Sequence, residues 1–134
     1  ELIGINIPKE LVSIAIDELP IILIAAASAK GKTILSGAVE LRVKESDRIQ
    51  SMLDGFTALG IKAEALDDGM IIEGGEFSGG IVDSNHDHRI AMAFSIAGII
   101  AREPVTINNC RNVATSFPEF VNTGKNLGMN IDYV

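Results

Sequence analysis

The sequence has few of the residues that crosslink a chain, cross a membrane or bind nucleic acid. Cys110 is the only cysteine, so no disulfide can form within the chain, and a reducing, cytoplasmic location is expected. The longest apolar stretches, residues 21–29 and 91–101, are shorter than the roughly 20 residues that span a bilayer. With 18 acidic against 11 basic residues and no basic run, neither a membrane nor a nucleic acid is the expected partner.

What the sequence does contain is an internal repeat. Asp17-Glu18-Leu19-Pro20 precedes one alanine-rich apolar run, and Asp87-His88-Arg89-Ile90 precedes a second. The repeat predicts one unit at about residues 13–80 and another at about 81–134. Because two stacked units have open ends, we expect residues 1–134 to be part of one domain of a larger, repetitive protein.

Helices and short strands are predicted to alternate in both units. Asp17 is expected to cap a helix over residues 20–30, and Ser46 or Asp47 to cap one that ends near Leu59. A further helix is expected at 88–101, and a last one at 118–127 with Phe117, Phe120 and Val121 packed in the core. Strands are predicted at 32–36, 61–65, 70–73, near 104–108 and at 129–133. This order indicates a layered α+β fold with the apolar helices inside.

The densest group of charges is Arg42-Val43-Lys44-Glu45-Ser46-Asp47-Arg48, at a predicted junction of loop and helix. Helix N-termini favour anions, and nearby Arg and Lys add charge-assisted contacts to phosphate or carboxylate oxygens. A carboxylate held between two cations stays ionised or carries a proton. The alternative is a solvated run of charges with a capping residue.

A second polar group, His86-Asp87-His88-Arg89, opens the helix of the second unit. Its two histidines fall short of the three or four ligands that zinc requires, so no metal is expected. One interpretation is a solvated turn in which Asp87 caps the helix; the other makes Arg89 an anion clamp. If the charged loop opens on the same rim as Asp17 and Asp87, five side chains converge there: Asp17, Lys44, Glu45, Arg48 and Arg89.

These motifs resemble those of the 5-enolpyruvylshikimate-3-phosphate synthase family. The stretch from Arg42 to Ile49 resembles one signature of that family, and the motifs at Asp17 and Asp87 resemble two more, in the right order. Thr115-Ser116-Phe117-Pro118 resembles a fourth, although many members have Lys where this chain has Thr115.

The resemblance implies two domains, each of three βαβαββ-type units around buried helices. This chain would hold about two units of the C-terminal domain, and the N-terminal domain would be absent. The implied reaction transfers the enolpyruvyl group of phosphoenolpyruvate to the 5-hydroxyl of shikimate 3-phosphate, in the shikimate pathway to chorismate and the aromatic amino acids. It needs no metal or organic cofactor.

The resemblance also implies roles for single residues. Asp17 would be the acid/base group near the reacting hydroxyl, and Glu45 would protonate the methylene carbon. Lys44 would contact shikimate 3-phosphate, Arg48 and Arg89 would hold phosphoenolpyruvate, and His88 would lie beside the site.

Three alternatives remain at this stage. The related enolpyruvyl transferase that acts on UDP-N-acetylglucosamine shares the implied architecture. A non-catalytic anion-binding module would use the same basic rim. The third is a folded fragment without activity, which we expect for residues 1–134 alone because a site between two domains cannot close with one missing.

Overall fold

The structure is a computed structural model that describes residues 1–134 as a succession of short helices and strands. None of the helices combines the length and the apolar character that crossing a bilayer requires. The elements of the first half are α1 (Lys9–Val12), the 3₁₀ turn η1 (Ile16–Glu18), α2 (Leu19–Ala27), β1 (Lys32–Leu35), the 3₁₀ turn η2 (Val39–Val43), α3 (Arg48–Ala58), β2 (Lys62–Leu66) and β3 (Gly69–Glu73). Those of the second half are β4 (Gly80–Asp83), α4 (His88–Ile100), β5 (Val105–Asn108), α5 (Asn112–Ser116) and α6 (Phe120–Asn126).

The strands form two separate sheets. β3 lies at the centre of a three-stranded antiparallel sheet, between β1 and β2. β4 and β5 form a parallel pair in which Val82 lies opposite Ile107. The segment before α1 also runs parallel to β1, through bridges from Ile3 to Lys30 and from Asn6 to Ile34. In both halves, therefore, a buried apolar helix connects two parallel extended segments.

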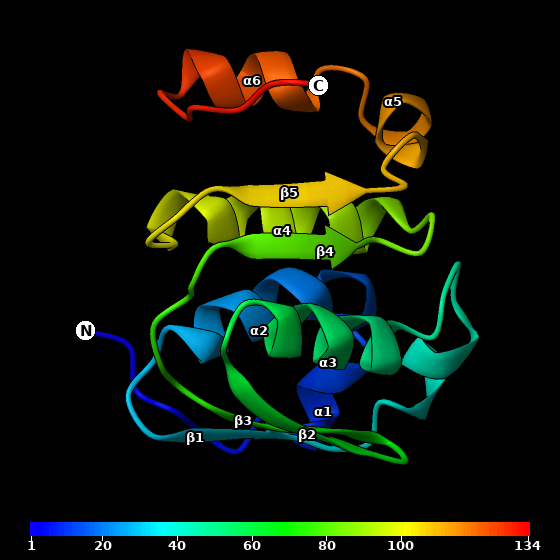
Figure 1. The fold of residues 1–134 in the computed structure, drawn as a ribbon. Helices are drawn as coiled ribbons and strands as arrows, with labels where there is room; N and C mark the ends of the chain where they lie inside the picture. Colours follow the sequence, from blue (N-terminus) through cyan, green and yellow to red (C-terminus); the bar gives the residue numbers. More distant parts are fainter.

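The helices α2 and α3 fill the space between the two sheets. Figure 1 shows them above the three-stranded sheet, with β4, β5 and α4 beyond them and α6 on the far side. The edge of the Phe56 ring meets Phe94 with centroids 5.6 Å apart, which joins α3 to α4. A Cβ at Gly55 would overlap the Phe94 ring, so this close approach depends on glycine. The layered α+β fold predicted from the sequence is confirmed.

Most predicted elements are found close to their expected positions, but the predicted cap of the first helix is wrong. Asp17 lies inside η1, and Glu18 occupies the N-cap position of α2 without a capping hydrogen bond. The chain enters α2 through a turn that is already coiled, and Pro20 in the first turn has no N–H that needs a partner. The Asp17 carboxylate is therefore not used in capping.

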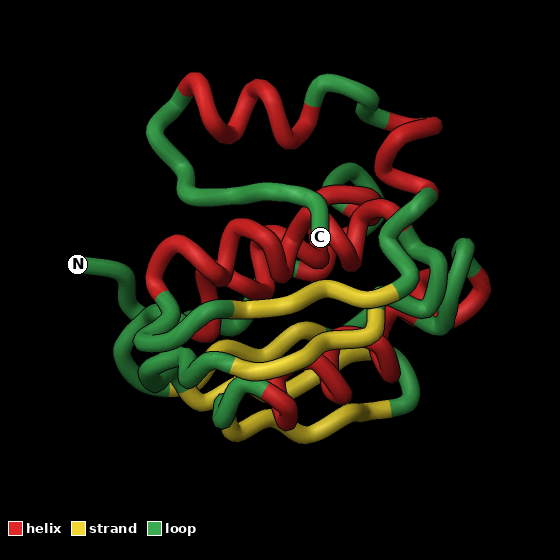
Figure 2. Tube along the Cα trace, turned by 45° about the horizontal axis from the view of Figure 1, so that its top comes forward, coloured by secondary structure: helices red, strands yellow, loops and turns green.

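The predicted strand at 129–133 is absent. After α6 the chain turns and runs back beside that helix, as the green segment near the C-terminus of Figure 2 shows. Met129 donates its backbone N–H to Gly124 O at 2.9 Å, and a Cβ on Gly124 would lie 3.2 Å from Ile131. The segment packs on a helix, whose backbone groups are already paired, so it has no strand partner.

The expected core packing before and within α6 is only partly correct. Val121 is buried, but Phe117 is 41% exposed. The Phe117 ring instead meets the edge of the Phe120 ring, with centroids 5.8 Å apart. The two aromatic rings therefore cover one another near the surface rather than entering the main core.

Candidate active site

Arg48 lies at the centre of the charged cluster. It is the first residue of α3, and only 1% of its side chain is exposed. Its guanidinium donates from Nε to Asp87 Oδ2 at 2.8 Å, from Nη1 to Asp17 Oδ1 at 3.3 Å and from Nη2 to Glu45 Oε2 at 2.6 Å. A buried guanidinium requires such partners, because an unpaired charge away from water is strongly unfavourable.

The loop that carries this cluster is held by Asp47 and Arg42. Asp47 caps α3, as predicted, by accepting from the backbone N–H of Gln50 at 3.1 Å. Arg42 donates to Asp47 Oδ2 at 2.8 Å and to the backbone oxygens of Leu66 and Asp67 at 2.6 and 2.8 Å. Arg42 thus ties the loop to the hairpin of β2 and β3, and it takes no part in the cluster around Arg48.

Asp87 is the buried partner of Arg48. It caps α4, as predicted, through Oδ1, which accepts from the backbone N–H of Arg89 at 3.0 Å and of Ile90 at 3.4 Å. Its Oδ2 also accepts from Ser46 Oγ at 2.9 Å. Burial acts to raise the pKa of Asp87, but the hydrogen bonds from Arg48 and Ser46 outweigh it and hold the pKa below its ordinary value.

Asp17 and Lys44 form the more open side of the cluster. Lys44 Nζ lies 3.6 Å from Asp17 Oδ1 and 3.1 Å from Glu40 Oε1. Desolvation acts to raise the pKa of Asp17, but the positive charges of Lys44, Arg89 and Arg48 lower it overall. The hydrogen bond to Glu40 is the main reason why the pKa of Lys44 is raised. Asp17 is therefore ionised at neutral pH and paired with cations.

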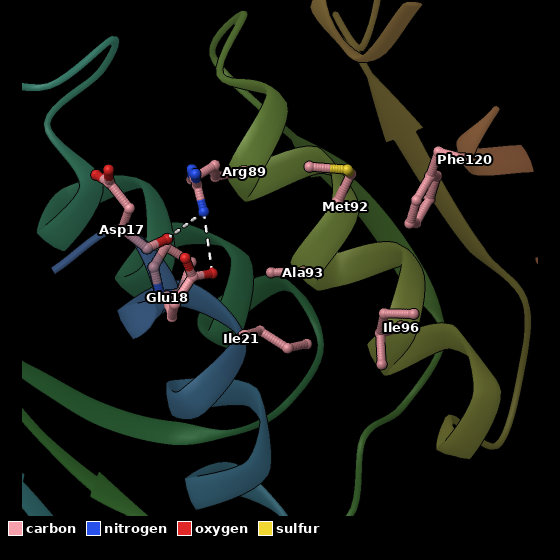
Figure 3. Close-up of a pocket in the computed structure, with 9 residues that line it drawn as sticks. Asp17, Glu18, Ile21, Arg89, Met92, Ala93, Ile96 and Phe120 are labelled. Carbon is pink, nitrogen blue, oxygen red and sulfur yellow. Dashed lines mark hydrogen bonds and ion pairs between the residues drawn. The ribbon is translucent and has the colours of Figure 1, made fainter. Parts of the chain in front are cut away.

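Arg89 comes from α4 and meets the start of α2. Its Nη1 donates to the backbone oxygen of Asp17 at 2.9 Å and to Glu18 Oε2 at 3.0 Å. The dashed lines of Figure 3 mark both contacts. Its Nη2 and Nε have no partner within the chain, which leaves these two nitrogens of the guanidinium fork for an anion.

A cavity of about 180 Å³ opens beside Arg89, and its lining is mainly apolar. In Figure 3 the Met92 and Ile96 side chains of α4 face Phe120 across this space. Its lining residues are Asp17, Glu18, Pro20, Ile21, Arg89, Met92, Ala93, Ile96 and Phe120. One charged wall and several apolar walls therefore meet at the same end of α2 and α4.

The structure thus brings together all five residues expected to converge: Asp17, Lys44, Glu45, Arg48 and Arg89. His88 is half-buried on the first turn of α4, and Thr115 is exposed on α5. No group of three or more His, Cys, Asp or Glu side chains has the arrangement of a metal site.

Two members of the cluster were not expected from the sequence. The sequence indicates Asp87 only as a helix cap and Glu18 only as an acid in the first turn of its helix. For Asp87 the sequence indicates little more than capping, which Oδ1 performs by accepting from the backbone N–H of Arg89. No neighbouring residue in the sequence shows that Oδ2 accepts from Arg48. Glu18 is adjacent to Asp17, and its contact with Arg89 depends on how the two units pack.

The arrangement can bind a small anion and move a proton. Arg48, Arg89 and Lys44 supply positive charge, and the half-exposed carboxylates of Asp17 and Glu45 reach solvent from the same cluster. Fold and site together define an α+β protein with a cluster of cations and carboxylates at the start of its central helices, a composition suited to anion binding and acid/base chemistry.

Comparison with known proteins identifies the family. The sequence model described as EPSP synthase (3-phosphoshikimate 1-carboxyvinyltransferase) matches residues 2–123. The chain therefore belongs to the EPSP synthase family, as its motifs indicate.

Individual relatives agree with this assignment. Proteins named 3-phosphoshikimate 1-carboxyvinyltransferase from Legionella pneumophila (strain Paris) and Methylococcus capsulatus are each 60% identical over 98% of this chain, which spans 30% of each relative. The structure of EPSP synthase from Acinetobacter baumannii matches 98% of this chain with a TM-score of 0.94 and 50% identity, over 31% of that protein. The chain thus spans about a third of the length of the relatives that it matches.

Proposed function

We propose that this chain forms part of a 3-phosphoshikimate 1-carboxyvinyltransferase. The longer protein would transfer the enolpyruvyl group of phosphoenolpyruvate to the 5-hydroxyl of shikimate 3-phosphate and release inorganic phosphate, on the route to chorismate. The main support is that two carboxylates, Asp17 and Glu45, both lie against the guanidinium of Arg48. Such an addition requires one proton taken from oxygen and another delivered to carbon beside a bound anion.

Asp17 is the group that we assign to the hydroxyl. Its lowered pKa leaves it ionised at neutral pH, so it can accept the proton of the 5-hydroxyl as that oxygen attacks. Lys44 lies 3.6 Å away, and its ammonium group is suited to contact shikimate 3-phosphate on the same side.

Glu45 is the group that we assign to the methylene carbon of phosphoenolpyruvate. A proton added to that carbon allows the neighbouring carbon to bond to the hydroxyl oxygen, which gives a tetrahedral intermediate. Removal of a methyl proton then expels phosphate and restores the double bond. The contact of 2.6 Å between Glu45 and Arg48 places this carboxylate beside one of the arginines assigned to phosphoenolpyruvate.

Arg48 and Arg89 are the arginines that we assign to phosphoenolpyruvate. The unpaired Nε and Nη2 of Arg89 suit a bidentate contact with a carboxylate or phosphate. Arg48 is rigidly held by Asp87, so its charge needs little rearrangement when substrate binds. His88, on the first turn of α4, has a weaker claim as a substrate contact.

We further propose that residues 1–134 belong to the C-terminal domain, with one unit at about 13–80 and the other at about 81–134. In support, α2 and α4 border an apolar groove, lined by Ile21, Ile24, Ile96, Ile99 and Ile100 among others, that a further unit would cover. The N-terminal domain would complete the site, so we expect the 134-residue chain alone to show no turnover. A cytoplasmic location suits both the reaction and the free thiol of Cys110.

A chimera tests the proposed function directly. The matching segment of the Legionella pneumophila relative is replaced by this chain, and phosphate release is measured with phosphoenolpyruvate and shikimate 3-phosphate. We expect turnover that saturates with shikimate 3-phosphate and none with UDP-N-acetylglucosamine. A folded chimera without turnover would favour a non-catalytic anion-binding module, and turnover with the UDP-sugar would favour the related transferase.

Glu45→Gln in the same chimera tests the proton-carrier role. The amide keeps the size of the side chain but cannot deliver a proton, so kcat is expected to fall on the order of 10²- to 10⁴-fold while both substrates still bind. Phosphate release gives kcat, and calorimetric titration with shikimate 3-phosphate gives binding. Unchanged kcat would remove Glu45 from the proton transfer.

A further inference from the structure

A chain of three hydrogen bonds leads from the surface to the buried carboxylate of Asp87. Asn85 donates from Nδ2 to Ser51 Oγ at 2.9 Å, Ser51 donates to Ser46 Oγ at 3.1 Å, and Ser46 donates to Asp87 Oδ2 at 2.9 Å. The reaction proposed above uses neither Asn85 nor Ser51. The chain joins the loop before α3, the first turns of α3 and the turn before α4.

The direction of these hydrogen bonds is fixed by their two ends. The Nδ2 amino group of Asn85 can only donate, and the Asp87 carboxylate can only accept. Each serine hydroxyl has a single hydrogen, so Ser51 and Ser46 must both point it towards Asp87. Hydrogen bonds that run in one direction and end on a charged acceptor strengthen one another.

The turn that presents Asn85 is unusual. Asn85 and His86 have φ of 51° and 59°, a left-handed conformation that costs energy in residues other than glycine. The backbone N–H of Asn85 donates to Asp83 Oδ1 at 2.8 Å, and Asn109 donates to the same carboxylate at 3.0 Å. This support holds the turn in place and directs the Asn85 amide towards Ser51.

We infer that Ser51 and Asn85 are positioning residues that fix the Asp87 carboxylate and, through it, the orientation of the Arg48 guanidinium. Two of the carboxylate's contacts come from Arg48 and one from Ser46. Ser51 is 2% exposed, so water cannot easily replace it as the partner of Ser46. The backbone N–H groups of Arg89 and Ile90 still hold Oδ1, so loss of this support loosens Oδ2. Arg48 Nε donates to Oδ2, and its direction towards Asp17 and Glu45 is then less closely fixed.

Because the consequence for catalysis rests on the proposed function, one measurement is made without substrate. Hydrogen exchange of the Arg48 Nε–H is followed by NMR in the 134-residue chain, for the wild type and for Ser51→Ala and Asn85→Gly. Glycine adopts positive φ without strain, so Asn85→Gly removes the amide but retains the turn. Both variants are expected to exchange this hydrogen about five- to tenfold faster than the wild type.

Two control variants separate positioning from a general loss of structure. The Ser95 hydroxyl donates only to Ala91 O within α4, so Ser95→Ala removes a serine hydroxyl away from the cluster. His86→Gly removes the neighbouring side chain at positive φ, and that side chain makes no hydrogen bond. Both controls are expected to exchange the Arg48 hydrogen at the wild-type rate.

The catalytic consequence is measured in the chimera. Ser51→Ala and Asn85→Gly are expected to raise the KM for phosphoenolpyruvate about five- to tenfold, with kcat and the KM for shikimate 3-phosphate within about twofold of the wild type. Asn85→Asp is expected to act in the same way, because the new carboxylate would accept the Ser51 proton and withdraw it from Ser46.

The outcomes separate the inference from the proposed function. Exchange of the Arg48 hydrogen at the wild-type rate in both variants, or equal acceleration in the two controls, would overturn the inference. An active chimera in which both variants keep the wild-type KM for phosphoenolpyruvate would overturn it too. A chimera without turnover would count against the proposed function, whereas the exchange rates would still decide whether Ser51 and Asn85 position Arg48.

Discussion

The region from the N-terminus to the end of α4 and the region after β5 differ in how their side chains are held. All 22 residues of the main hydrophobic cluster lie between Val12 and Ala97. After β5 only Val113 and Val121 are buried hydrophobic residues, and neither belongs to that cluster. The charged site is built entirely from the first region, so dense packing on several sides fixes its geometry.

The same contrast separates two ion pairs of similar length. Arg48 and Asp87 are in contact at 2.8 Å with side chains 1% and 0% exposed. Lys125 and Asp132 are in contact at 3.1 Å with side chains 45% and 72% exposed. Distance alone therefore says little about the strength of an ion pair, because solvent screens the second pair and not the first.

The largest expected effect on stability comes from Arg48→Ala. This change leaves the Asp87 carboxylate buried without its cation, and the free energy of unfolding is expected to fall by about 3–5 kcal/mol. Urea denaturation followed by circular dichroism measures it. The matched control is Lys125→Ala, which is expected to change the free energy of unfolding by less than about 0.5 kcal/mol. Equal effects of the two substitutions would show that the two ion pairs do not differ in this way.

Two phenylalanines extend the comparison to apolar packing. Phe94 is fully buried between α3 and α4, and Phe94→Ala is expected to lower the free energy of unfolding by about 3–5 kcal/mol through the cavity that it leaves. Phe117 is 41% exposed, and Phe117→Ala is expected to cost less than about 1 kcal/mol. The same denaturation measurement applies. A large loss for Phe117→Ala would mean that the segment before α6 is more tightly packed than its exposure indicates.

The sequence predicts helices best, because the residues that begin a helix lie next to it in the chain. The caps at Asp47 and Asp87 lie directly before the helices that they begin, and the apolar run after Pro20 lies in the helix that it predicts. The convergence of the charged residues followed from placing equivalent aspartates of the two units at one rim. That prediction needed the repeat as well as local patterns.

Contacts between distant segments could not be predicted in the same way. Nothing near Asp87 in the sequence shows that its second oxygen accepts from Arg48, and nothing near Glu18 shows that it pairs with Arg89. The wrong strand at 129–133 has the same cause. Alternating apolar residues there are typical of a strand, but a strand forms only if a partner edge lies beside it, and here the neighbour is α6.

The pH dependence of stability is the smallest of these effects, because it is limited to one carboxylate. The pKa of Asp87 is lower in the folded chain than in the unfolded chain, where it takes its ordinary value of 3.8. As pH falls below that value, the unfolded chain binds a proton first, so the contribution of Asp87 is complete above it and is lost towards the lower pKa of the folded state. Asp87→Asn should therefore be less stable than the wild type at pH 7, and the difference should narrow as pH falls through 3.8 and below.

The matched control for this titration is Asp132→Asn in the sparsely packed region. Its hydrogen bond with Lys125 also lowers the pKa of Asp132, so its effect has the same sign, but both side chains are exposed and solvent weakens the interaction. Urea denaturation from pH 7 to pH 3 should show a clear convergence of Asp87→Asn with the wild type and almost parallel curves for Asp132→Asn. A constant gap between Asp87→Asn and the wild type over this range would mean that the Asp87 charge does not stabilise the fold. The role of Asp87 would then rest on hydrogen bonds that an amide can also make.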